Sequence, residues 1–104
     1  MRQIYNKLVR DRIPEIIEES GRCCVVEVLS DADYIHMLNE KLNEELAEYQ
    51  KDQSLEELAD LLEVIRAVVI ARGYSIDELE KIRIEKAQQR GGFERKLFLK
   101  YVEE

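Results

Sequence analysis

Apolar side chains recur at helical spacing in the middle of the chain. Between residues 34 and 51 they lie three or four positions apart, on one face of a helix: Tyr34, Leu38, Leu42, Leu46 and Tyr49. Asp31 or Asp33 can cap the start of this helix, because a short acidic side chain accepts hydrogen bonds from the free N–H groups of the first turn. The pattern therefore predicts a helix from about residue 34 to about residue 51.

A second long helix is predicted after a short link. Ser54 and Glu57 have the spacing of a capping box, which marks a helix start. The segment LADLLEVIRAVVIA that follows is apolar around almost its whole circumference, and Gly73 ends the helix. One neighbouring helix cannot cover such a surface. We therefore expect this helix to lie at the centre of an oligomer, with an interface that includes Leu62, Ile65 and Val69.

The C-terminal part predicts one more helix. Ser75 and Glu78 form another capping box, and the helix runs to about Gln89, where RGGF interrupts it. The last segment, FERKLFLKYVEE, is expected to be an extended or short helical tail.

The N-terminal part predicts an extended arm with a basic tip, YNKLVRDR. Pro14 suits the first turn of a short helix that ends near Gly21. CCVVEVL has the β-branched density of a short strand, in which Cys23 and Cys24 would be buried, reduced thiols. The expected fold class is mainly α: an antiparallel helical bundle with one or two short strands near the termini, in a single domain over residues 1–104.

The net charge and the hydropathy of the chain argue against some classes of binding partner. The chain carries 23 acidic and 16 basic side chains, a formal net charge of −7, which argues against general binding of nucleic acid or of an anionic membrane. No apolar run approaches the roughly 20 residues that span a membrane. The N-terminus lacks the apolar core of a secretory signal, so we expect a cytoplasmic protein.

The acidic motif EELA occurs twice. The first copy is followed by Glu48 and the second by Asp60. Residues three apart share a helix face, so Glu45 lies beside Glu48 and Glu57 lies beside Asp60. A short link folds the two helices antiparallel. This arrangement places Glu48 level with Glu57 and Glu45 level with Asp60, and it predicts that the four carboxylates converge.

Converging carboxylates need a counter-charge. Two of them 4 Å apart repel by about 4 kcal/mol at an effective dielectric constant of 20. A site made only of oxygen ligands suits a hard cation, Mg²⁺ or Mn²⁺. The alternative is a plain solvated face, in which Glu57 only completes a capping box.

The same residues carry a resemblance to a known family. KLNEELAE followed by EELADLLEVI resembles the paired EExxE and ExxD motifs of the MazG-type nucleotide pyrophosphohydrolases, in the branch called phosphoribosyl-ATP pyrophosphohydrolase-like. YNKLVRDRIPEII near the start and RGGF near the end resemble further blocks of that branch. The resemblance extends roughly from Tyr5 to Phe93.

The resemblance implies a MazG-like helical bundle completed by a second subunit, as a homodimer or homotetramer. It implies Mg²⁺-dependent hydrolysis of a nucleoside triphosphate, or a related nucleotide, to a monophosphate and pyrophosphate, in the housekeeping of nucleotide pools. The implied metal ligands are Glu45, Glu48, Glu57 and Asp60, with Glu44 as an outer or second-metal ligand. Glu45 or Glu48 would accept a proton from the attacking water. The link between Glu48 and Glu57 is short for the family, which leaves open how much of the substrate pocket it forms.

Two basic clusters flank the motif blocks. Lys7, Arg10 and Arg12 lie on the N-terminal arm, and Lys86 and Arg90 share a face of the last helix. Through the resemblance both clusters are expected to bind phosphates. The alternatives are a solvated arm and a surface pair at the negative end of a helix dipole. A function from another class also stays open: a non-catalytic helical interaction or regulatory module on the same scaffold.

Overall fold

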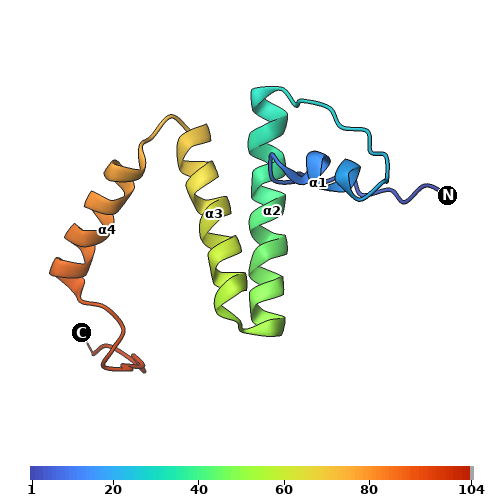
Figure 1. Ribbon diagram of the computed structural model, residues 1–104. Coiled ribbons are helices and arrows are strands. Elements are labelled where there is room, and N and C mark those ends of the chain that lie inside the picture. The colour runs from blue at the N-terminus through green and yellow to red at the C-terminus, as the bar shows by residue number, and fades with distance from the viewer. Residues whose placement is uncertain (104) are drawn as a thin grey trace.

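The computed structural model describes residues 1–103 and is mainly helical (Figure 1). Its helices are α1 (Ile13–Glu19), α2 (Asp31–Asp52), α3 (Leu55–Ala71) and α4 (Ile76–Arg90). The expected α class is confirmed. The bundle is formed only in part, because α2 packs against α3 and α3 contacts α4, whereas α1 contacts none of the other described helices.

A tight turn folds α2 and α3 into an antiparallel hairpin. Gln53 adopts a left-handed conformation, with φ 55°, and its N–H donates to the carbonyl of Tyr49. Ser54 then caps α3, since its Oγ accepts from the N–H of Glu57 at 3.2 Å. The turn therefore contains only two residues outside the helices, which fixes how far along each helix the facing side chains lie.

The caps confirm two predictions and correct a third. Ser75 caps α4 by accepting from the N–H of Glu78, and Ser54 caps α3 as expected. At the start of α2, however, the cap is Ser30, whose Oγ accepts from the N–H of Asp33 at 3.2 Å. The helix therefore begins at Asp31, three residues before the expected start. A hydroxyl caps as well as a carboxylate does, and the acids at 31 and 33 instead lie in the first turn, where the helix dipole favours them.

The expected strand is wrong. CCVVEVL is irregular, no strand occurs in residues 1–103, and the side chains of Val25 and Val28 are fully exposed. A β-branched segment becomes a strand only when another segment offers hydrogen-bonding partners, and none lies beside it in the described chain. Cys23 is accordingly exposed, and Cys24 is only half-buried, with its Sγ 3.9 Å from the carbonyl oxygen of Pro14. The tail after Phe93 is also neither helix nor strand up to residue 103, and Glu104 lies outside the described residues.

The core between the helices is thin. Leu38 of α2 and Val64 of α3 are the buried apolar side chains of the described chain, at 5% and 9% exposure. The radius of gyration is 18.5 Å, whereas a compact chain of this length has about 13 Å. Figure 1 shows the reason: α4 diverges from the hairpin instead of closing over it. Within the described part of the chain, no helix has the length and apolarity needed to cross a membrane.

Candidate metal centre

The hairpin brings the four acids of the repeated motif together. Carboxylate oxygens of Glu45, Glu57 and Asp60 lie within 4.8 Å of one another. Glu48, Asp52 and Glu57 form a second group with the same spacing. Glu57, in the first turn of α3, belongs to both groups. The four acids thus lie in two overlapping groups that share Glu57, and not in the single quartet that the sequence predicts.

The spacing and chemistry of these oxygens suit one hard cation at each group. Mg²⁺ holds its ligands at 2.0–2.1 Å in an octahedron, so two ligand oxygens on one ion lie roughly 3–4 Å apart. The carboxylate oxygens of each group lie within 4.8 Å of one another, so small side-chain rotations are enough to bring them to this spacing. Every ligand atom is a carboxylate oxygen, which favours Mg²⁺ or Mn²⁺ over softer metals.

Repulsion among the acids is concentrated on Glu57. Partial desolvation raises the pKa of its carboxyl group, and the negative charges of Asp60, Glu48, Asp52 and Glu45 raise it further. The ionised form of Glu57 is thus disfavoured where it stands. A divalent cation would reverse that balance, because its charge attracts all of these carboxylates at once.

Two participants were missed by the sequence interpretation. Asp52 joins the second group from the last turn of α2, four residues after Glu48, a spacing that places both on one face. Lys41 lies one turn before the motif, and its Nζ is 3.4 Å from Oε1 of both Glu44 and Glu45. The same helical spacing identifies each of them, but the helix predicted from the sequence ends at about residue 51, one residue before Asp52.

Glu44 stands apart from both carboxylate groups. Its Oε1 accepts from Lys7 Nζ at 3.0 Å and lies beside Lys41. Desolvation raises the pKa of Glu44, but the hydrogen bond from Lys7 and the charge of Lys41 outweigh it, and the net pKa lies below the ordinary value. The pKa of Lys7 is raised in turn, chiefly by its hydrogen bond to Glu44. The outer-ligand role expected for Glu44 therefore competes with two lysines.

The basic side chains of the N-terminal arm form ion pairs with acidic side chains. Arg10 Nη2 donates to Asp60 Oδ1 at 2.9 Å, so the arm reaches the first carboxylate group directly. Arg12 pairs instead with Glu15 of α1, three residues away. Of the three arm residues expected to bind phosphate, Arg10 thus lies at a carboxylate group, Lys7 lies on the neighbouring Glu44, and Arg12 lies at neither.

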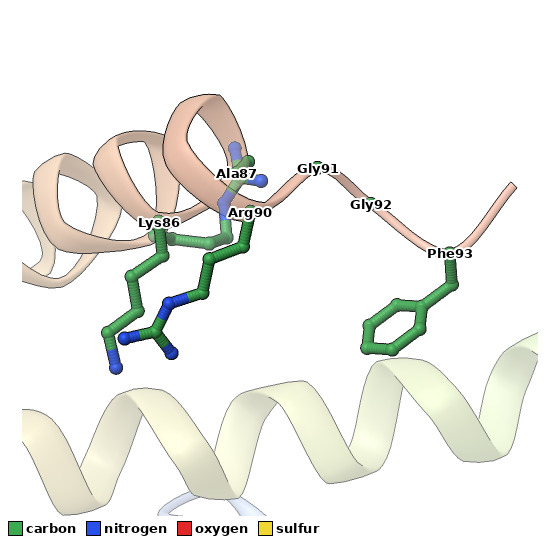
Figure 2. Close-up of a pocket in the computed structure, with 7 residues that line it drawn as sticks. Lys86, Ala87, Arg90, Gly91, Gly92 and Phe93 are labelled. Carbon is green, nitrogen blue, oxygen red and sulfur yellow. The ribbon is translucent and has the colours of Figure 1, made fainter. Parts of the chain in front are cut away.

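The cations of α4 line a separate hollow of about 400 Å³. Figure 2 shows the side chains of Lys86, Arg90 and Phe93 on one side of α4 and of the segment that follows it. Arg83 also lines the hollow and is paired with Glu80. No ion pair joins Lys86 or Arg90 to an acid of the hairpin in residues 1–103. The structure therefore does not unite the two basic clusters within one chain.

Comparison with known proteins leaves the activity open. No family model matches the chain, and no solved structure matches it. An uncharacterized protein of Mycolicibacterium smegmatis is 50% identical over 54 residues, which cover 48% of this chain and 55% of that relative. The chain thus spans about half the length of the curated relative it matches, and the relative's description names no activity to transfer.

Proposed function

We propose that the α2–α3 hairpin binds Mg²⁺ and that the protein hydrolyses a nucleoside triphosphate, or a related nucleotide, to a monophosphate and pyrophosphate. The observation that supports this most directly is the position of Glu57 in two carboxylate groups at once. Like charges held this close, with the pKa of Glu57 raised, are typical of a functional site. The resemblance of the EELAE and EELAD blocks to pyrophosphohydrolase motifs supplies the reaction class.

The ion pairs of each carboxylate indicate which role it has in the proposed reaction. Glu45, Glu57 and Asp60 would hold the metal, which when bound shields the polyphosphate and polarises the phosphoryl group under attack. Glu45 shares its Oε1 with Lys41, whereas Glu48 makes no ion pair in the described chain and is exposed. We therefore assign to Glu48 the acceptance of a proton from the attacking water, a role that requires a free carboxylate oxygen.

A second copy of the chain completes the bundle in this proposal. The accessible surface is 9911 Å², whereas a folded monomer of 12.3 kDa exposes about 6,100 Å². A stable interface buries about 800 Å² on each partner, so the excess is ample for a dimer or a tetramer. The uncovered apolar surface follows α3 and its junction with α4, where Val69, Tyr74, Leu79 and Ile82 line a further hollow.

Exposed apolar surface also favours the second candidate function, a helical interaction module without catalysis. Thermal unfolding with and without Mg²⁺, at one protein concentration, separates the two. For the metal-binding enzyme, Mg²⁺ at 100 times its Kd adds about 2.7 kcal/mol to the unfolding free energy. We expect the Tm to rise by at least about 10 °C. A Tm that follows ionic strength alone, and is equal in MgCl2 and matched NaCl, would favour the interaction module.

We expect Arg90→Ala to weaken nucleotide binding about tenfold or more while leaving the affinity for Mg²⁺ unchanged. Arg90 lines the hollow at the end of α4, and a guanidinium can hold two phosphate oxygens at once. Calorimetry with a non-hydrolysable nucleoside triphosphate in Mg²⁺, and with Mg²⁺ alone, measures both affinities. Lys81→Ala is the matched control, since Lys81 is exposed on α4 but does not line the hollow. Equal nucleotide affinity in both variants would assign the phosphate contacts elsewhere.

A further inference from the structure

The N-terminal arm, residues 5–12, is attached to the hairpin by charge. Lys7 Nζ lies 3.0 Å from Glu44 Oε1 on α2, and Arg10 Nη2 lies 2.9 Å from Asp60 Oδ1 on α3. These pairs join residues 37 and 50 positions apart. The helix that follows the arm, α1, contacts no other helix of residues 1–103. The arm thus crosses the open side of the hairpin with little apolar packing to hold it, since Leu8 is its one half-buried side chain.

Both pairs are weak enough to be reversible. The side chains are 41% and 35% exposed in the Lys7–Glu44 pair, and 59% and 46% exposed in the Arg10–Asp60 pair. Ion pairs with this exposure contribute little to stability and are screened by salt. An attachment made of them holds the arm in place and still allows a stronger cation to displace it.

The arm and a metal ion would use the same acid. Asp60 belongs to the carboxylate group with Glu45 and Glu57, and it is the residue to which Arg10 donates. A divalent cation among these oxygens would bring two positive charges beside the guanidinium, and like charges this close repel even where solvent screens them. Occupation of the group by a metal and attachment of Arg10 therefore oppose each other.

We propose that the arm is a strap that a divalent cation releases. In the metal-free protein Lys7 ties it to Glu44 and Arg10 ties it to Asp60. A cation bound by Glu45, Glu57 and Asp60 displaces Arg10 and leaves the arm held by the Lys7 pair alone, which is too weak to keep it ordered. The inference rests on the proposed metal site and states the order in which Arg10 contacts first a carboxylate and then the substrate. Arg10 first neutralises a carboxylate and, once displaced, becomes available to the phosphates of a polyanionic substrate. The acidic site is thus kept partly neutral until the metal arrives.

The first test needs no metal. Backbone ¹⁵N relaxation measures the order parameters of residues 5–12 in the metal-free protein and in a variant with Lys7→Ala and Arg10→Ala. We expect ordered values in wild type and values below about 0.6, typical of flexible backbone, in the variant. A control with Arg2→Ala and Arg22→Ala removes the same charge from exposed side chains that make no ion pair in the described structure. An arm equally ordered in all three proteins would overturn the strap, whatever the metal does.

The second test adds MgCl2, with NaCl of equal ionic strength as the control. We expect Mg²⁺ to make the arm of wild type flexible, and the Lys7 and Arg10 variant to bind Mg²⁺ about three- to tenfold more tightly in calorimetry. The control variant should keep the wild-type affinity to within about twofold. Mg²⁺ binding that leaves the arm ordered overturns the strap but keeps the metal site. An absence of Mg²⁺ binding in every protein overturns the metal site, and with it the release.

Discussion

Glu57→Gln is expected to lower Mg²⁺-dependent hydrolysis by about 100-fold or more while leaving the helix content intact. The change keeps the shape of the side chain and removes the one carboxylate that both acidic groups share. Stabilisation by a bound metal amounts to several kcal/mol, and each 1.36 kcal/mol corresponds to a tenfold change in rate. Calorimetry should show that Mg²⁺ binding is weakened in parallel.

The same variant should be at least as stable as wild type when no metal is present. The pKa of Glu57 is raised in the folded protein, so folding favours the protonated form. The ionised form therefore opposes folding at neutral pH, and this opposition disappears as the pH falls below the raised pKa. Glutamine has no charge to repel. A Tm equal to or above that of metal-free wild type, together with lost activity, is a combination that a general folding defect cannot produce.

Glu56→Gln is the matched control for this variant. Glu56 precedes Glu57 in the first turn of α3 and is exposed, and it belongs to neither carboxylate group. Its replacement should keep activity and Mg²⁺ affinity near those of wild type. If Glu57→Gln binds Mg²⁺ as tightly as Glu56→Gln, the assignment of the metal centre is wrong.

Leu62→Asp is expected to weaken self-association by at least about 100-fold and to lower the Tm sharply. Leu62 lies on α3 and is 56% exposed in the single chain. Burial of a leucine contributes about 1.5–3 kcal/mol, and a charge buried without a partner opposes association further. Because one chain buries few apolar side chains, a monomer has little else to stabilise its helices.

Sedimentation and light scattering at micromolar concentration measure the result. Wild type should have at least twice the 12.3 kDa mass of one chain, and Glu63→Lys, a charge change at the next exposed position of α3, should keep that mass. A wild-type protein that stays monomeric under these conditions contradicts the interface, and Leu62 would then be ordinary surface.

The structural features that could be predicted best from the sequence are those that depend only on residues close together along the chain. Helix starts at Ser54 and Ser75 follow from capping chemistry within one turn, and the hairpin follows from the short link between two apolar stripes. The prediction of a strand for CCVVEVL was wrong for the opposite reason. A strand needs a partner segment to pair with, and no local pattern reveals whether one is present. The arrangement of α4 was equally beyond prediction: its side chains from residue 81 onward are all exposed, so nothing in its sequence fixes where it packs.

The candidate site shows the same division. The level pairing of acids across the turn was predictable, since it needs only helical spacing and a count of link residues. The contacts of Lys7 with Glu44 and of Arg10 with Asp60 were not, because an irregular arm has no periodicity from which its path can be derived. Lys7 and Arg10 were expected to bind phosphate, whereas in the structure both side chains form ion pairs with carboxylates.

The two-residue turn at Gln53 and Ser54 has a consequence for how this protein can vary in evolution. Gln53 holds the left-handed position and Ser54 is the cap, so the turn contains no spare residue. An insertion that is not accommodated as a longer loop unwinds the end of α2 or the start of α3, where Asp52 and Glu57 lie. Most surface loops tolerate changes of length, but here an insertion that shifts one helix along the other would separate carboxylates. Homologues that keep the acids should therefore keep the length of this turn, or have lengthened it only together with new residues that restore the spacing.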